Sequence, residues 1–186
     1  MAPVRNTGPR WPEMTRPYYR DLKLLVCPSD LGPDNRHRPG TAETRTNELP
    51  ADASPRTYIF NGWNDWFCEM QQVCDMGTMN GMSMNEGNIS LPSDTVTFGE
   101  KLYSTTHFYM DFLESKGGSG VGNDIDILNH AVHNSTLRSE KGGSPSGGSN
   151  YTFADGSARY LKYGKSLAPI NLWATTDKWR TNSLGF

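Results

Sequence analysis

The four histidines of the chain, His37, His107, His130 and His133, are its first candidates for metal binding or proton transfer. His130 and His133 lie three positions apart, so in a helix both side chains would share one face. A catalytic zinc ion needs further ligands close by, and the chain contains neither an H-E-x-x-H nor a C-x-x-C motif. The sequence therefore favours ordinary polar histidines at the end of a helix over a zinc site.

Oxygen-bearing side chains follow the glycine-rich stretch 117–122. Asn123, Asp124 and Asp126 occupy three of four consecutive positions, and hard oxygen ligands are those that Ca²⁺ prefers. The spacing does not match an EF-hand loop. Two interpretations stay open, a calcium site and a solvated acidic turn that caps a helix, and the pattern favours the acidic turn.

The sequence does not support nucleophilic catalysis. Cys27 precedes a proline in an apolar run, and no G-x-S-x-G motif is present. The glycines at 117–122 are not followed by Lys and then Ser or Thr, as they would be in a phosphate-binding loop. We therefore expect that the chain is not an enzyme.

Composition and charge exclude further classes of protein. The chain has 186 residues with 18 Lys and Arg against 20 Asp and Glu, a net charge of −2, so it has no basic excess for nucleic acid. No apolar run reaches the roughly 18 residues of a transmembrane helix, and the first residues lack the pattern of a secretion signal. Among the three cysteines, Cys68 and Cys74 are close in sequence, and whether they form a disulfide stays open.

The patterns of apolar and turn residues predict an extended proline-rich arm over residues 1–17 and one globular domain over residues 18–186. Asp155-Gly156 is expected as the tight turn of a β-hairpin. Alternating apolar and polar residues predict strands near 57–61, 95–100, 150–155 and 158–163.

Other segments are less regular. Residues 22–26 form an apolar cluster that fits either one helical turn or a short buried strand, and the run 107–114 fits a strand or a helix. Five methionines crowd residues 64–88, which we expect to be a loop over the core with a short helix near 85–89. Residues 30–56 are expected as a long surface loop, 123–132 as a short helix, and 138–149 as a flexible Gly/Ser insertion.

Aromatic residues allow a second kind of binding site. Tyr58, Trp63, Trp66 and Tyr109 could form a platform on which sugar rings stack. The alternative, which we favour, is that these side chains pack in the core. The stretch 167–179 carries enough leucine, isoleucine and tryptophan to dock on the body of the protein.

Several motifs, taken in order, resemble one protein family. The segments YYRDLKLLVCPSD (18–30), RTYIFNGW (56–63), LPSDTVTFGEK (91–101), HFYMDFLE (107–114) and GGSNYTFADGSARYLKYGKSLAPINLWA (147–174) resemble bacterial prepilin-like proteins. These are the type II secretion pseudopilin-like (G-type) proteins with a C-terminal H-X9-DG processing-associated domain. The matching motif residues are His133, Asn150, Phe153, Asp155 and Gly156. His133 stands further from Asp155 than the family spacing because a Gly/Ser stretch intervenes, and the family's N-terminal prepilin helix is not in this chain.

The resemblance implies a pilin-like α+β head with an antiparallel sheet. It also implies export to the cell envelope, the periplasm or the cell surface, and a structural, non-enzymatic role in a pilus-like or pseudopilus filament. Its partners would be other copies of the chain or other pilin-like subunits, with exported protein cargo or polysaccharide as further partners. Related major pseudopilins bind calcium, which adds Asp155 to Asn123, Asp124 and Asp126 as candidate ligands. The alternative function is a secreted carbohydrate-binding or adhesion module.

Overall fold

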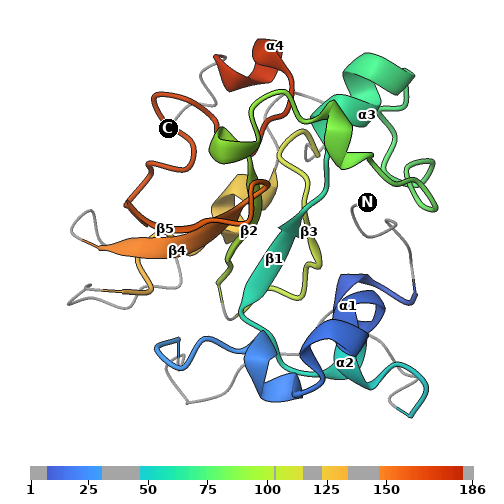
Figure 1. The fold of residues 1–186 in the computed structure, drawn as a ribbon, viewed down its shortest axis with the longest axis vertical. Helices are drawn as coiled ribbons and strands as arrows, with labels where there is room; N and C mark the ends of the chain where they lie inside the picture. Colours follow the sequence, from blue (N-terminus) through green and yellow to red (C-terminus); the bar gives the residue numbers. More distant parts are fainter. Residues whose placement is uncertain (1–7, 31–46, 103, 115–122, 134–146, 182–186) are drawn as a thin grey trace.

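The computed structural model of the chain describes residues 8–30, 47–102, 104–114, 123–133 and 147–181, and these form an α+β fold. The helices are α1 (Trp11–Tyr19), α2 (Pro50–Ala53), α3 (Asn64–Gln71) and α4 (Asp177–Arg180). The strands are β1 (Tyr58–Asn61), β2 (Val96–Glu100), β3 (Tyr109–Met110), β4 (Gly148–Phe153) and β5 (Ala158–Lys162). In Figure 1, α1 and α2 lie at one end of the molecule and α3 and α4 at the other, with the sheet between them.

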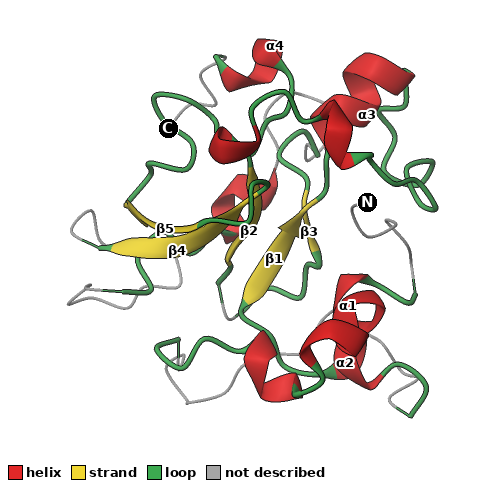
Figure 2. Cartoon of the chain, viewed as in Figure 1, coloured by secondary structure: helices red, strands yellow, loops and turns green. Residues whose placement is uncertain are grey.

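The five strands form a single sheet in the order β3-β1-β2-β4-β5. Three of its pairings are antiparallel, but β1 and β3 run parallel, so the sheet is mixed rather than antiparallel as the resemblance implied. The strands expected from alternation are confirmed (Figure 2). The expected hairpin is also confirmed, because β4 and β5 pair across a turn in which Gly156 has φ +84° and Asp155 Oδ1 accepts the Ser157 N–H at 2.9 Å.

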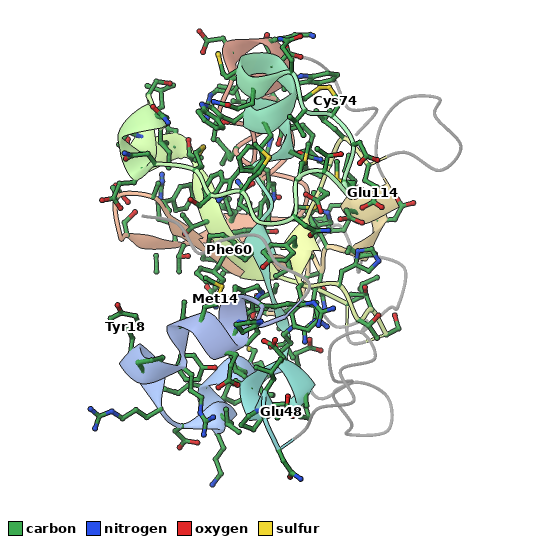
Figure 3. All side chains as sticks on the ribbon, turned by 90° about the vertical axis from the view of Figure 1, so that its right-hand side faces the viewer. Met14, Tyr18, Glu48, Phe60, Cys74 and Glu114 are labelled. Atoms are coloured by element: carbon green, nitrogen blue, oxygen red, sulfur yellow. A yellow bond between two sulfur atoms is a disulfide. The ribbon has the colours of Figure 1, made fainter. Side chains whose placement is uncertain are left out.

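Apolar side chains cover both faces of this sheet. In β1, Ile59 belongs to one buried core and Phe60 to a second, as the alternation of a strand requires. The first core holds Ile59, Val96, Met110, Phe112, Ile125, Leu128, Tyr151, Phe153, Leu167, Trp173 and Ala174. The second holds Trp11, Leu25, Ala51, Phe60, Trp63, Phe67, Met79, Met84, Ile89, Phe108 and Tyr109, and Figure 3 shows Phe60 among these inner side chains.

The expectation of an extended arm is wrong for residues 11–17, which belong to helix α1. Pro12 lies in the first turn, where its missing N–H has no helical partner to lose, although Pro17 lies inside the helix. A distant contact fixes the helix: Trp11 Nε1 donates to the Phe108 carbonyl at 2.8 Å. Residues 1–7 of the predicted arm lie outside the described residues.

Helices α1 and α2 also cap each other. The buried Asp52 carboxylate of α2 accepts the N–H groups of Arg10 and Glu13 at 2.7 and 3.1 Å. In return, the Glu13 carboxylate of α1 accepts the Ala51 N–H at 2.7 Å. Because the first N–H groups of a helix have no partner within it, each helix satisfies donors at the start of the other.

Other irregular segments are now defined. Leu22–Leu25 is a 3-10 turn rather than a strand, Glu86–Asn88 is the expected short helix, and Asn123–Ile127 is a 3-10 helix that is shorter than expected. The prediction that 64–88 is mainly a loop is wrong at its start, which forms α3. The run 107–114 contributes only the two-residue strand β3. Residues 31–46 of the predicted loop 30–56 lie outside the described residues, and the prediction is wrong at Pro50–Ala53, which forms α2 with Ala51 and Asp52 fully buried. Residues 138–146 of the predicted Gly/Ser insertion also lie outside the described residues, and the prediction is wrong at Gly148 and Ser149, which belong to β4.

The aromatic platform for sugar is contradicted by burial. Trp63 and Tyr109 are only 3% and 8% exposed and belong to the second core, against which Tyr58 and Trp66 also pack. The faces of Trp63 and Tyr109 are therefore covered by protein, and Tyr58 and Trp66 are half-buried. The docking of the stretch 167–179 is confirmed, because Leu167 and Trp173 lie in the first core.

Two further open points are settled by the structure. Cys68 and Cys74 form a disulfide at the end of α3, and Figure 3 shows the sulfur–sulfur bond at Cys74. None of the helices in the described part of the chain combines the length and hydropathy needed to cross a membrane.

Close packing between the sheet and its first core predicts the effect of Gly99→Ala. A Cβ atom at this position would lie 2.7 Å from Trp173 Cζ2 and 2.8 Å from Tyr151 Cε1. We expect this variant to lose about 1–3 kcal/mol of unfolding free energy in urea titrations, the usual cost of overpacking a core. Gly87→Ala is the matched control, because its Cβ would meet nothing closer than Asn85 Oδ1 at 3.4 Å. Equal stability of the two variants would contradict the close packing.

Burial of His130 predicts a loss of stability in acid. Its side chain lies against the Tyr163 ring, and burial lowers its pKa from 6.5 to about 4. The unfolded chain therefore takes up this proton first, so stability falls as the pH drops from 6.5 towards 4, by about 2–3 kcal/mol near the lower end. We expect His130→Gln to show a shallower pH dependence of unfolding free energy over this range. Identical slopes in the variant and the parent chain would exclude His130 as the cause.

Candidate functional site

Four polar side chains from separate segments meet at the end of β2. They are Cys27, which follows the 3-10 turn, Glu100 at the end of β2, His133, and Asn150 in β4. We call this group the polar cluster. It is the one place where cysteine, carboxylate, imidazole and amide groups come together among the residues that the structure describes.

Backbone hydrogen bonds place these side chains. The Cys27 N–H donates to Thr57 Oγ1 at 2.7 Å, and the Thr57 carbonyl accepts the Lys101 N–H at 2.8 Å, which brings Cys27 beside the end of β2. His133 and Gly148 exchange two backbone hydrogen bonds of 2.9 and 3.1 Å. These bonds place His133 beside Gly148, the first residue of β4. Asn150 follows Gly148 by two residues in the same strand.

The side chains converge on a single ring nitrogen. His133 Nε2 lies 3.1 Å from Glu100 Oε1, 2.8 Å from Asn150 Nδ2 and 3.8 Å from Cys27 Sγ. The other carboxylate oxygen, Glu100 Oε2, accepts the Asn150 N–H at 2.9 Å. Glu100 is fully buried and Cys27 is 4% exposed, whereas the His133 side chain is 21% exposed. The cluster is therefore closed at Glu100 and opens to solvent at His133 and Asn150.

Burial governs the acid–base properties of the cluster. Loss of solvent raises the pKa of the Cys27 thiol to about 11, and the neighbouring Glu100 carboxylate adds to this effect. Burial also lowers the pKa of Lys101 to about 7, helped by the charge of Arg56. The pKa of Tyr58 is raised by burial and by Cys27. A thiol in these surroundings stays protonated near neutral pH and is a weak nucleophile.

The predicted motif residues divide into two groups. His133 and Asn150 lie in the polar cluster, whereas Phe153 is buried in the first core and Asp155 and Gly156 form the β4–β5 turn. His130 and His133 were expected to be ordinary polar histidines at the end of a helix. This expectation is wrong for His133, which belongs to the polar cluster. Cys27 and Glu100 were not predicted as site residues. For Cys27, its position in the CPSD segment was the one indication in the sequence that it belongs to a site.

The candidate calcium ligands are also separated. Asp124 and Asp111 are buried and Glu114 is half-buried, and one carboxylate oxygen of each lies within 4.8 Å of those of the others. Asp124 accepts the Asp111 N–H at 2.9 Å and lies 3.1 Å from His107 Nδ1, which raises the pKa of that histidine.

Asp126 and Asp155 do not join this acidic group, and the side chain of Asn123 lies outside the described part of the chain. Asp126 is exposed on the 3-10 helix that begins at Asn123, and Asp155 is exposed at the hairpin turn. Of the calcium candidates whose side chains the structure describes, Asp124 alone therefore lies in a group with the donor atoms for a cation. Asp111 and Glu114, from the run 107–114, were missed.

Comparison with known proteins gives no match for this chain. No protein-family model matches it, and neither does any curated protein or solved structure. The resemblance of the motifs to the prepilin-like family therefore stays a prediction.

The raised pKa of Cys27 predicts slow alkylation. At pH 8 the folded thiol should react with iodoacetamide about 100-fold more slowly than the same thiol in the urea-unfolded chain, because so little of it is ionised. The rate should rise with pH towards about 11. The measurement is mass spectrometry of the labelled chain with a chelator present and the disulfide left intact. Rapid labelling already at pH 7 would identify an activated nucleophile and contradict a non-enzymatic role.

Proposed function

We propose that this chain is a non-enzymatic structural subunit, the pilin-like head of a pilus-like or pseudopilus filament in the bacterial cell envelope. The observation that carries the proposal is the polar cluster. It joins Cys27 of the CPSD segment to the motif residues His133 and Asn150 in one network of polar contacts around Glu100. Motif residues that meet in this way hold strands and loops in place, as a structural head requires.

The disulfide supports the exported location that belongs to this proposal. Disulfides persist in oxidising compartments such as the periplasm and the cell surface, and they are rare in the reducing cytosol. The Cys68–Cys74 bond is therefore in keeping with a chain that works outside the cytoplasm.

The edge of the sheet offers a surface for contacts between subunits. β5 is the last strand in the sheet order, and Figure 2 shows β4 and β5 at the side of the sheet away from α1 and α3. In an antiparallel pair, the N–H groups of successive residues point alternately towards and away from the partner strand. The Tyr163 N–H donates to the Gly147 carbonyl, so in β5 every second N–H counted back from Tyr163 points towards β4. The N–H groups of Ala158 and Tyr160 lie at the positions between and point away from β4. A row of outward-facing backbone groups is a template for a strand of another copy.

The alternative function, a carbohydrate-binding or adhesion module, is not carried forward. It depended on stacking of sugar rings against the aromatic residues of the region 58–67 and on the acidic residues at 123–126. Trp63 is buried in the second core, and Tyr58 and Trp66 pack against that core. No other feature of the described residues favours it over the structural role.

The proposal predicts that association of the purified chain depends on the β5 edge. We expect larger species to increase with concentration in light scattering, and ordered assemblies in negative-stain electron microscopy. Ala158→Pro removes one outward N–H at the start of an edge strand and should abolish this association while preserving the fold. Ala158→Val, which keeps that N–H, is the matched control and should associate like the parent chain.

Two results would count against the proposal. A chain that stays monomeric at every concentration would remove the support for a self-associating subunit. Association that is equal in Ala158→Pro and Ala158→Val would show that β5 is not the contact. Circular dichroism of both variants verifies that the head is folded in each case.

A further inference from the structure

We infer that the polar cluster is a binding site for one zinc ion, held by Cys27 Sγ, Glu100 Oε1 and His133 Nε2. This inference concerns a ligand of the head and does not depend on filament assembly. It rests on the chemistry of three donor atoms, on their spacing, and on a conflict among their hydrogen bonds.

The donor atoms match zinc in type and spacing. Zinc in proteins is bound by thiolate sulfur, imidazole nitrogen and carboxylate oxygen in tetrahedral geometry. Its bond lengths put the ligand atoms about 3.3–3.7 Å from one another. The structure has 3.8 Å between Cys27 Sγ and His133 Nε2 and 3.1 Å between His133 Nε2 and Glu100 Oε1. The third pair, Cys27 Sγ and a carboxylate oxygen of Glu100, also lies within 4.8 Å, so the three donor atoms surround one common position.

The second observation is the crowding of His133 Nε2. A ring nitrogen carries either one hydrogen or one lone pair. The Glu100 carboxylate requires a hydrogen on this nitrogen, whereas an Asn150 N–H donor requires a lone pair. Both cannot be satisfied at once. A cation among the three donor atoms satisfies Nε2 and Glu100 together, because Nε2 then gives its lone pair to the metal and Glu100 Oε1 binds the metal directly.

The charges of the site also balance around zinc. When Cys27 binds zinc, its S–H proton leaves to solvent and a sulfur–zinc bond forms. One thiolate and one carboxylate then neutralise the two positive charges of the ion in a site where Cys27 and Glu100 are almost wholly removed from water. Burial of a charge is tolerated when it is paired in this way. Asn150 is exposed, so the cluster opens to solvent on this side and a water molecule can serve as the fourth ligand of the ion.

Cys27 is available for this role. The disulfide occupies Cys68 and Cys74, so Cys27 is the free cysteine of the chain. Any thiolate-to-metal absorption band from the intact protein must therefore come from Cys27. This makes cobalt, which takes the place of zinc in tetrahedral sites, a selective probe.

The test uses the whole purified chain after removal of metals with a chelator. We expect one equivalent of zinc to bind, and one equivalent of cobalt to give a thiolate charge-transfer band that added zinc abolishes. Cys27→Ser and His133→Gln should each weaken zinc binding at least about tenfold, since even residues that only orient a metal ligand cost about 10–100-fold. His107→Gln, which alters the histidine beside the separate acidic group, is the control and should bind zinc like the parent chain.

A measurement on the unaltered chain keeps the test valid if a variant fails to fold. Zinc should protect Cys27 from alkylation by iodoacetamide, and removal of zinc should restore labelling. The inference is overturned if the parent chain binds no zinc, if cobalt gives no thiolate band, or if His107→Gln loses zinc while Cys27→Ser retains it. The last result would place the ion at Asp111, Glu114 and Asp124.

Discussion

The buried carboxylate of Glu100 imposes the strictest constraint on this molecule. A carboxylate withdrawn from water needs hydrogen-bond donors, and those of Glu100 come from His133 and from the backbone of Asn150. Both donors depend on the register of β4 against its neighbours. A slip of one residue would turn the Asn150 side chain to the opposite face of the sheet and separate it from His133 Nε2. The contacts of the polar cluster therefore require the correct register of β4.

Buried carboxylates join distant segments at both ends of the molecule. Asp65 of α3 accepts the N–H groups of Thr175 and Thr176, which precede α4, at 2.8 and 2.9 Å. Asp52 does the same for the start of α1. The helices at each end are short, so they gain little from their own hydrogen bonds. Their placement depends on these carboxylates and on the two cores.

Local sequence predicted the parts of the fold that local interactions determine. The hairpin around Asp155-Gly156 and the alternating strand β2 were predictable because turn residues and side-chain periodicity act within a few positions. Helix α1 was not, because its stabilising contacts with Phe108 and Asp52 come from 97 and 42 positions away. The candidate site shows the same limit. His133 was identified by its motif, but Cys27 and Glu100 lie 106 and 33 positions from it, and no local pattern records a contact at such separations.

The hydrogen bond from Trp11 to Phe108 has a consequence for the order in which the protein forms during synthesis. Trp11 belongs to the second core together with Phe60 and Phe108, so this core lacks essential members until the chain has grown past Phe108. Closing such long loops costs conformational entropy before the stabilising contacts of the core can form, and this slows folding. The amino-terminal half of the nascent chain therefore leaves the ribosome without a complete core and has to wait for the strands that follow.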